Sequence, residues 1–344
     1  MRRAVVLGGT GAIGWAATRR LTAAGWDVVV TGRDPARAPS GLAATGARFV
    51  RADRHDPATL PAVLGGGADL VVDCACYSAA HAAALLPCLG DVTSTVMISS
   101  KAVYVDDQGR HSNSEAPPEF DAPITEDHAT LRPGPAPYDS REGYGPNKVA
   151  AEETLLASGH PVTVLRPSKV HGAWSRQPRS WFFVKRVLDR RPAVLLAHRG
   201  AGADHPSAAV NIAALISTVA DLPGRRVLNA ADPDCPDGRT LAAAIAGHLG
   251  HRWQEVLLDD AAPHGLGRHP WDRVPPVALD TAAARRLGYT PVGDFAATVA
   301  DEIDWLVGAT GGHPGARPPA IEGLATPGPG DYAEEDAWLR LHPT

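Results

Sequence analysis

A tyrosine and a lysine stand four residues apart in the segment Tyr144-Gly145-Pro146-Asn147-Lys148, which begins a predicted helix. Residues four apart share one face of a helix, so the phenol and the ammonium are expected to lie close together. A nearby cation favours the ionised form of a tyrosine, and the phenol can then exchange a proton near neutral pH. The pair therefore predicts acid–base chemistry in which Tyr144 carries the proton and Lys148 tunes its release.

Two serine hydroxyls, those of Ser99 and Ser100, close a predicted strand that precedes this helix. Ligands of open α/β sheets bind beyond the carboxyl ends of the strands, which is where these hydroxyls fall. Ser100 is expected to hydrogen-bond a substrate oxygen and hold it against the Tyr144 hydroxyl. Ser99 is the second candidate, and the alternative for both is a simple cap on the strand end.

Three glycines, Gly8-x-x-Gly11-x-x-Gly14, link the first predicted strand to the first predicted helix. Glycine lets the backbone approach a pyrophosphate closely, and the free amides of a helix N-terminus attract its negative charge. In this strand–turn–helix context the trio predicts dinucleotide binding, although a plain βα turn is the alternative. The residues expected to contact the dinucleotide here are Gly8, Thr10, Gly11, Ala12, Ile13 and Gly14.

The residue that follows the second strand decides which dinucleotide is expected. An acid there suits the ribose hydroxyls of NAD, whereas an arginine suits the 2′-phosphate of NADP. Arg33 stands directly past the strand and Asp34 follows it, so NADP is favoured and NAD is the alternative. Asp53, after the third strand, is a candidate for the adenine amino group or for a helix cap before Pro57.

Short apolar strands alternate with helical stretches over the first half of the chain, which predicts a parallel sheet covered on both faces. Right-handed crossovers then give a doubly wound, Rossmann-type α/β fold. The predicted strands are Ala4–Leu7, Asp27–Thr31, Arg48–Arg51, Leu70–Cys74, Thr95–Ser99 and Val162–Arg166. The predicted helices are Ala12–Ala24, Ala79–Leu86, Gly145–Ala157, Asn211–Ala220, Thr240–Leu249 and Phe295–Val307.

We expect three regions: a dinucleotide-binding core over 1–171, a smaller interleaved substrate lobe with returning core elements over 172–309, and a Gly/Pro-rich tail over 310–344. Within the core, residues 105–143 lack periodicity and read as a long functional loop. In the tail, Asp331–Leu341 is predicted to be a short helix that docks through Tyr332, Trp338 and Leu341.

Composition excludes several classes of protein. The 344 residues carry a net charge of −5 and no apolar run near the length of a membrane helix, so neither a nucleic-acid binder nor a membrane protein is expected. The N-terminus lacks the apolar stretch of a signal peptide, which predicts a cytoplasmic location. Cys74 and Cys76 would share one face of a strand, but no second ligand pair follows at zinc spacing, so no metal is expected.

Taken in chain order, these pieces resemble the short-chain dehydrogenase/reductase superfamily, in its extended, epimerase/dehydratase-like branch. The likeness covers about residues 1–172 and extends more loosely to about 308. It implies that Ser100, Tyr144 and Lys148 form a catalytic trio and that Lys148 also binds the nicotinamide ribose, with Pro167 and Ser168 near the nicotinamide. The matching motifs are Gly8-x-x-Gly11-x-x-Gly14, Ser99-Ser100-x-x-Val103-Tyr104, Tyr144-x-x-x-Lys148 and Leu165-Arg166-Pro167-x-x-Val170-x-Gly172.

Departures from the pattern concern the substrate. Nucleotide-sugar members of this branch often have Asn and Tyr where this chain has Lys169 and His171. They also often carry a diphosphate-binding arginine that is absent from the stretch 203–213, although Arg199 or Lys169 could replace it. Lys169, His171 and Trp174 are the candidate substrate contacts. For His171 the alternative is a structural hydrogen bond, and for the aromatic residues from Trp174 to Phe183 it is packing.

The sequence thus favours NADPH-dependent reduction of a ketone on a small metabolite. One alternative is a nucleotide-sugar epimerase or dehydratase that retains tightly bound NAD, and another is a regulatory protein that binds the dinucleotide without chemistry. A small-molecule substrate is the expected partner, with a homodimer as one option for assembly; neither nucleic acid nor a membrane is expected.

Overall fold

The computed structural model describes the chain except for residues 57, 260–262, 264, 316–331 and 343–344. The chain divides into two compact units. The first unit comprises Met1–Ser168, Ala209–Ala231 and Leu279–Val292, and the second comprises Lys169–Ala208, Asp232–Ala278 and Gly293–Thr344. No helix of the described residues is long and apolar enough to cross a membrane.

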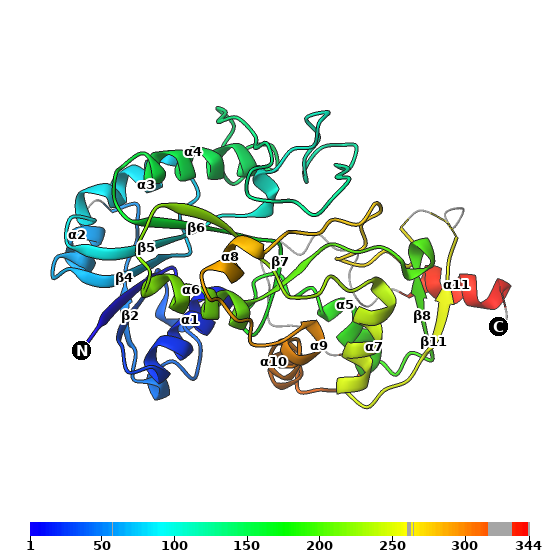
Figure 1. The fold of residues 1–344 in the computed structure, drawn as a ribbon. Helices are drawn as coiled ribbons and strands as arrows, with labels where there is room; N and C mark the ends of the chain where they lie inside the picture. The colour runs from blue at the N-terminus through cyan, green and yellow to red at the C-terminus, as the bar shows by residue number, and fades with distance from the viewer. Residues whose placement is uncertain (57, 260–262, 264, 316–331, 343–344) are drawn as a thin grey trace. The chain divides into compact units, whose positions relative to one another are not determined.

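A parallel seven-stranded sheet forms the centre of the first unit, in the order β10-β6-β5-β4-β1-β2-β3 (Figure 1). The order reverses between β1 and β4, the place where ligands bind in doubly wound sheets. This topology confirms the predicted fold class. The strands are β1 (Arg3–Leu7), β2 (Asp27–Gly32), β3 (Arg48–Arg51), β4 (Ala68–Asp73), β5 (Val92–Ile98), β6 (Val162–Pro167) and β10 (Arg226–Ala230).

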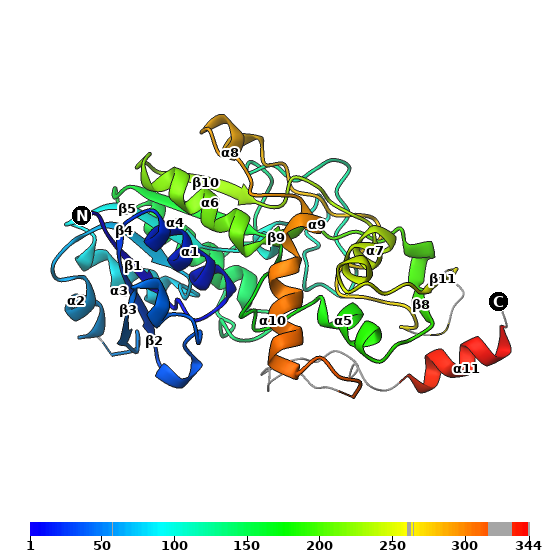
Figure 2. The same ribbon diagram turned by 90° about the horizontal axis from the view of Figure 1, so that it is seen from below.

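Helices cover both faces of this sheet. α1 (Ala12–Ala23) packs with α6 (Ala209–Ala220), and α3 (Ala79–Leu85) packs with α4 (Tyr144–Leu156) on the opposite side of the sheet (Figure 1). Figure 2 looks onto the side covered by α1 and α6. Burial on both faces explains why the central strands are almost wholly apolar. Val5 in β1, Val71 in β4 and Val164 in β6 are completely buried.

Two further helices complete the first unit, α2 (Thr59–Leu64) and α8 (Ala282–Arg286). Strand β10 was not predicted, because it comes after the helix α6 in the half of the chain where the alternation loosens. The stretch from 105 to 143 has turns and isolated bridges but no helix or ladder, as predicted. Strand β4 ends at Asp73, so the prediction that Cys74 and Cys76 share a strand face is wrong; both lie in the segment before α3.

The second unit has two small parallel sheets and a helical core. β7 (Lys169–His171) pairs with β9 (Pro206–Ala208), and β8 (Ala193–Leu196) pairs with β11 (Gln254–Leu257). The predicted helix Phe295–Val307 is two helices, α9 (Phe295–Thr298) and α10 (Ala300–Thr310). The other helices are α5 (Trp181–Leu188), α7 (Gly238–His248) and α11 (Ala333–Leu341).

The terminal helix α11 belongs to the second unit and is fixed at two of the three predicted points. Trp338 packs with Leu195 and Leu258, and the Tyr332 hydroxyl donates to the Asp189 carboxylate at 2.7 Å. Leu341 is 77% exposed, so its predicted docking role is wrong. Most of the predicted extended tail, residues 316–331, lies outside the described residues.

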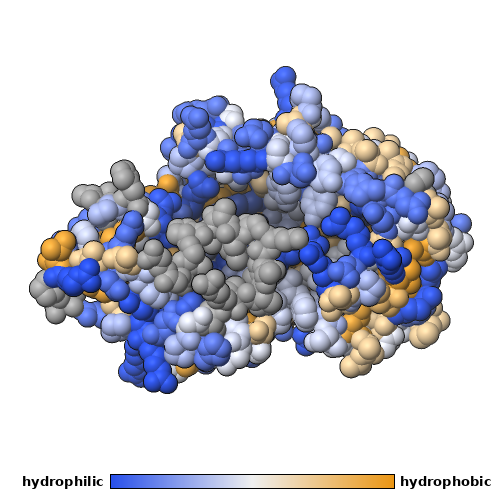
Figure 3. All heavy atoms as spheres, turned by 180° about the vertical axis from the view of Figure 1, so that it is seen from behind, coloured by the Kyte–Doolittle hydropathy of each residue, from blue (hydrophilic) through white to orange (hydrophobic). Residues whose placement is uncertain are grey.

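The described residues expose few large apolar side chains. On the face shown in Figure 3, hydrophobic residues lie in small groups among hydrophilic ones. The large hydrophobic side chains that are exposed in the described residues are far apart in sequence: Met1, Leu222, Val274, Val292 and Leu341.

A buried ion pair closes the end of β4. Asp73, a charged residue inside an apolar strand, has a fully buried side chain that binds Arg54 through two hydrogen bonds of 2.9 and 3.1 Å. Its Oδ1 also accepts from the amide of Ala75 at 2.9 Å. The Arg54 guanidinium further donates to the His81 carbonyl, so one pair connects β4, the segment after β3 and α3.

We expect Asp73→Asn to lower the free energy of unfolding by about 3–5 kcal/mol, because the Arg54 guanidinium would stay buried without its counter-charge. Urea denaturation near neutral pH measures the loss. Asp259→Asn is the matched control, since it removes a carboxylate from an exposed pair with Arg199 and should cost less than about 1 kcal/mol. Equal losses in the two variants would contradict the prediction.

Candidate active site

The glycine turn between β1 and α1 has the backbone geometry that close approach of a ligand requires. Gly8 has φ +71°, a conformation that favours glycine, and a Cβ on Gly14 would lie 2.4 Å from the Gly9 Cα. Gly11 is the N-cap of α1 and has no side chain to occupy the helix amides. A Cβ there would meet no described atom within 4 Å. The turn therefore offers open amides at a helix N-terminus, which suits a pyrophosphate.

Arg33 lies directly after β2 and is exposed. Its acidic neighbour Asp34 is already used, because its carboxylate accepts from the Ala36 amide at 3.0 Å and pairs with Arg37. Asp53 is also exposed, and its carboxylate accepts from the His55 amide at 3.1 Å in a local turn. Arg33 thus has no acidic partner among the described residues, whereas Asp34, the acid next to it, is bound to Ala36 and Arg37.

The Tyr144–Lys148 pair lies on the first two turns of α4, and both side chains share one face as predicted. The Lys148 side chain is buried, and its Nζ lies 5.9 Å from the centre of the Tyr144 ring. Nζ donates to the carbonyl oxygens of Cys76 at 2.7 Å and Ile98 at 2.8 Å. Burial lowers the pKa of Lys148, and this effect is opposed chiefly by the nearby Tyr77 and Cys76.

The two candidate serines have different surroundings. Ser99 is buried and donates to the carboxylate of Glu152. Ser100 is half-buried, and its Oγ accepts from the Ala102 amide at 3.1 Å, which caps the short 3-10 turn Lys101–Val103. A hydroxyl that accepts can still donate its own proton to a substrate oxygen. These contacts favour Ser100 over Ser99 for the role in chemistry.

Sequence reasoning missed a buried polar frame behind the trio. Glu152, one turn after Lys148 in α4, receives hydrogen bonds of 3.1 and 2.5 Å from the Arg166 guanidinium at the end of β6. Arg166 also lies over the Tyr104 ring, 4.8 Å from its centre. The Tyr104 hydroxyl donates to Asn229 in β10 at 2.7 Å. The signal available in the sequence was Arg166, a charged residue in the largely apolar strand β6; Glu152 lies in a helix with other polar residues and does not stand out.

Tyr104 itself is an unsuitable proton donor. Burial raises the pKa of Tyr104 to about 12, with Arg166 acting in the opposite direction. The phenol therefore stays protonated at neutral pH and serves as a hydrogen-bond donor to Asn229. Among the tyrosines of the family-like motifs, this leaves Tyr144 as the candidate for acid–base work.

Pro167 and Ser168, the residues that the family resemblance places near the nicotinamide, belong to the first unit with the catalytic candidates. Pro167 is the last residue of β6, and Ser168 follows it. Lys169 then begins β7 in the second unit, where its Nζ lies 3.3 Å from the Asp204 carboxylate. Burial lowers the pKa of Lys169 to about 7, and the cations Arg179 and Arg273 add to this effect.

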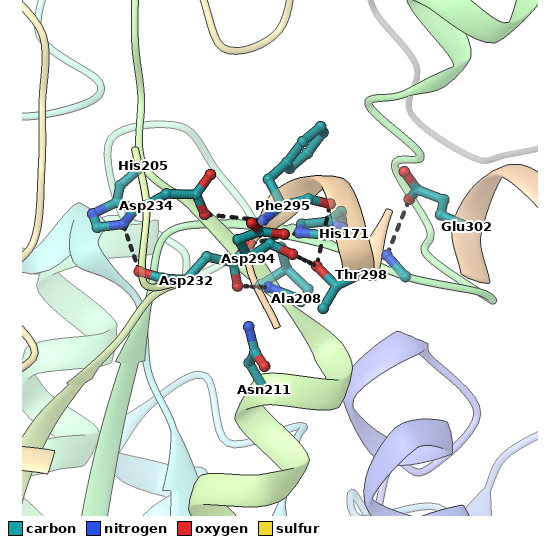
Figure 4. A network of polar contacts seen from close by, with 12 residues as sticks. His171, His205, Ala208, Asn211, Asp232, Asp234, Asp294, Phe295, Thr298 and Glu302 are labelled. Atoms are coloured by element: carbon teal, nitrogen blue, oxygen red, sulfur yellow. Dashed lines mark hydrogen bonds and ion pairs between the residues drawn. The ribbon is translucent and has the colours of Figure 1, made fainter. Parts of the chain in front are cut away.

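His171 is completely buried in the second unit, where the structure shows the structural hydrogen bond that was its alternative role. Its Nε2 lies 2.9 Å from Oδ2 of Asp232. Asp232 also accepts from the Ala208 amide at 2.6 Å, and its carbonyl pairs with His205 (Figure 4). His171 therefore joins β7, β9 and the segment after β10 into one polar network.

Glu302 in α10 completes this network (Figure 4). Its carboxylate is fully buried and accepts from Ser180 and from the Gly172 amide. Burial raises the pKa of Glu302, whereas the nearby His171 and the Ser180 hydrogen bond act in the opposite direction.

The aromatic residues after His171 mainly pack the second unit. Trp181 and Phe183 are buried in its hydrophobic core, and the Arg186 guanidinium covers the Phe182 ring at 3.6 Å. Trp174 differs, because it is half-buried, has φ +67° and contacts the Trp305 ring at 5.8 Å. Across the described part of the chain, no three His, Cys, Asp or Glu side chains gather as a metal site.

Two comparisons at the level of sequence give matches to this chain. A family model described as the NAD dependent epimerase/dehydratase family matches residues 4–201. The 2′-dehydrokanamycin reductase of Streptomyces kanamyceticus is 35% identical over 159 residues, which are 45% of this chain and 38% of that protein. The matched part therefore spans well under half the length of this curated relative.

Solved structures share the fold at low identity. A dTDP-glucose 4,6-dehydratase from Streptomyces venezuelae with NAD and TYD bound has a TM-score of 0.66 and 22% identity, covering 90% of this chain and 98% of that one. A UDP-glucose 4-epimerase from Thermotoga maritima has a TM-score of 0.65 and 17% identity, covering 88% and 98%.

The Glu302 carboxyl predicts a pH dependence of stability. Between its ordinary pKa of 4.5 and its raised value, the folded protein holds a proton that the unfolded chain releases, so the stability from this group falls as pH rises. We expect Glu302→Gln to remove this fall, so that urea denaturation increasingly favours the variant above pH 4.5. Glu334→Gln, an exposed site in α11, controls for the loss of one charge. A constant difference between Glu302→Gln and the unchanged protein would contradict the prediction.

Proposed function

Because the chain belongs to the NAD-dependent epimerase/dehydratase family, we propose that it is an NADPH-dependent oxidoreductase that reduces a ketone of a small metabolite to a secondary alcohol. The observation that carries the proposal is the buried Lys148 ammonium on the same helix face as Tyr144, with Ser100 at the end of the neighbouring strand β5. This arrangement supplies a proton donor, a cation that tunes it and a hydroxyl that can hold the substrate oxygen.

The open amides of the glycine turn support binding of the dinucleotide there. In this proposal the turn from Gly8 to Gly14 holds the pyrophosphate, Arg33 holds the 2′-phosphate and Lys148 contacts the nicotinamide ribose. Asp53, Pro167 and Ser168 are the further proposed cofactor contacts. When bound, the nicotinamide supplies the hydride that a carbonyl carbon accepts.

The chain's own residues handle the oxygen and its proton. Ser100 donates a hydrogen bond to the ketone oxygen and fixes its position. Tyr144 gives that oxygen a proton as it becomes a hydroxyl, and the Lys148 ammonium stabilises the phenolate left behind. Lys169, His171 and Trp174 stay predicted contacts for the substrate.

Reduction is favoured over the other outcomes of this chemistry by two features. Arg33 is exposed with no acidic partner among the described residues, which suits the 2′-phosphate of NADPH. The similar protein from Streptomyces kanamyceticus is named as a reductase, 2′-dehydrokanamycin reductase.

A second candidate function is epimerisation or dehydration of a nucleotide sugar, because the similar folds include such enzymes with NAD bound. An enzyme of that kind returns the hydride to its substrate and keeps its NAD. Mass spectrometry of the denatured protein separates the two candidates, since stoichiometric NAD that co-purifies would exclude an NADPH-consuming reductase.

Arg33→Ala should weaken NADPH binding far more than NADH binding, because only NADPH carries the 2′-phosphate. Loss of a charge-assisted phosphate contact corresponds to about 10-fold or more in Kd. Fluorescence titration of the full chain with each dinucleotide measures the ratio. The nearby Arg37→Ala, whose guanidinium faces Asp34, is the control. Equal losses for NADPH and NADH would refute the phosphate role of Arg33.

Tyr144→Phe should reduce the rate of ketone reduction by about 10²–10⁴, because it removes the proton donor and leaves the ring. Loss of NADPH absorbance can be followed with 2′-dehydrokanamycin and with a panel of keto sugars. Cofactor affinity of the variant should stay close to that of the unchanged chain. Unaltered turnover in Tyr144→Phe would overturn the assignment and favour a chain that binds the dinucleotide without chemistry.

A further inference from the structure

We propose that Tyr77 is a positioning residue for the catalytic centre, whose ring holds the Lys148 ammonium in place beside Tyr144. The inference rests on the proposed roles of Tyr144 and Lys148, and it adds a residue that lies outside the sequence motifs. It also gives a function to the long segment 105–143, which contributes the second ring of the arrangement.

Three groups lie in direct contact with the Lys148 ammonium. It has three N–H donors, and the carbonyls of Cys76 and Ile98 accept two of them, at 2.7 and 2.8 Å. The Tyr77 ring centre lies 4.3 Å from the same nitrogen, which is the geometry of a cation–π contact. The Tyr77 ring is therefore a third group in direct contact with the ammonium, besides the two carbonyls.

Tyr77 is itself held by aromatic neighbours. Its ring stacks on that of Tyr138, with centres 5.8 Å apart and planes 14° from parallel. The His81 ring meets both tyrosines edge-on, at 6.3 and 5.1 Å, and its Nδ1 accepts from the Tyr77 amide. Tyr138 belongs to the long segment and Tyr77 to the turn before α3, so the stack connects that segment to Lys148.

The ring contact matters for Lys148 because the charged groups around it are bound to other residues. Asp73 is bound to Arg54, and no carboxylate of the described residues forms an ion pair with Lys148. Burial and Asp73 raise the pKa values of Cys74 and Cys76 to about 12, so both thiols stay neutral. Burial lowers the pKa of His81 to about 4, so its ring is neutral as well.

The remaining titratable groups near this centre are few. Glu152 lies on the same helix as Lys148, but its carboxylate is bound by Arg166 and Ser99. His55 contacts the edge of His81. The carboxylates of Asp73 and Glu152 still favour the ammonium from a distance, but the groups in direct contact with it are two carbonyls and one aromatic face.

Displacement of the Lys148 ammonium would change the ionisation of Tyr144. The cation favours the phenolate, so removing the ring that holds it should make Tyr144 ionise at a higher pH. A residue that only fills space next to α3 would change stability without moving this ionisation. The ionisation of Tyr144 is therefore the readout that separates positioning from packing.

The test compares Tyr77→Phe, which keeps the ring, with Tyr77→Leu, which removes it. Each variant of the full chain is titrated by tyrosinate absorbance, with and without Tyr144→Phe, and the difference gives the ionisation of Tyr144 alone. We expect the apparent pKa of Tyr144 to be higher in Tyr77→Leu than in Tyr77→Phe by about half a unit or more. Equal values in the two variants would overturn the proposal.

A second pair of variants tests the same idea if Tyr77→Leu does not fold. Tyr138→Leu removes the stacking partner and leaves Tyr77 present, whereas Tyr138→Phe preserves the stack. The leucine variant should raise the Tyr144 pKa relative to the phenylalanine variant, and no difference would remove the proposed role of the stack. Circular dichroism at each pH limits the comparison to folded protein.

The titration needs no substrate, so its outcome is separate from that of the proposed function. If ketones are not reduced while the Tyr144 pKa still differs between the Tyr77 variants, the proposed function falls and the positioning role stands. If Tyr144→Phe abolishes ketone reduction while the two Tyr77 variants titrate alike, the function stands and the positioning role falls.

Discussion

Burial of the Lys148 ammonium is the constraint on which the rest of the candidate site depends. An unpaired charge inside a protein is costly unless its donors are satisfied, and here this is done by two backbone carbonyls and an aromatic face. One of the carbonyls follows β4 and the other ends β5, so the lysine requires these strands to be adjacent and their ends to be level. The doubly wound sheet provides this arrangement.

Further buried charges in the first unit are paired at the same edge of the sheet. Arg166 at the end of β6 binds Glu152 of α4, and Asp73 at the end of β4 binds Arg54. These pairs fix the helix that carries Tyr144 and the segment that carries Tyr77. Because breaking such a pair leaves an uncompensated charge, the frame around the catalytic candidates resists rearrangement.

The second unit follows the same principle with different groups. His171 and Asp232 tie its short strand β7 to the segment after β10, while Glu302 holds the start of α5 through Ser180. Lys169 lies next to Asp204, and its pKa is lowered by burial first and by the nearby Arg179 and Arg273 second. The sheets described in this smaller unit have two strands each, and polar networks connect its short strands and helices.

The sequence by itself determined the fold class, the glycine turn and the Tyr144–Lys148 pair, because these depend on local spacing and on the period of apolar residues. Six of the strands of the main sheet were also predicted, whereas β10 follows a helix distant in the chain. Only the tertiary structure showed that Ser99 is bound to Glu152, that His171 pairs with Asp232, and that the Tyr77 ring, stacked on Tyr138, lies on Lys148. These contacts join residues far apart in sequence, and no local pattern records which buried group will meet which partner.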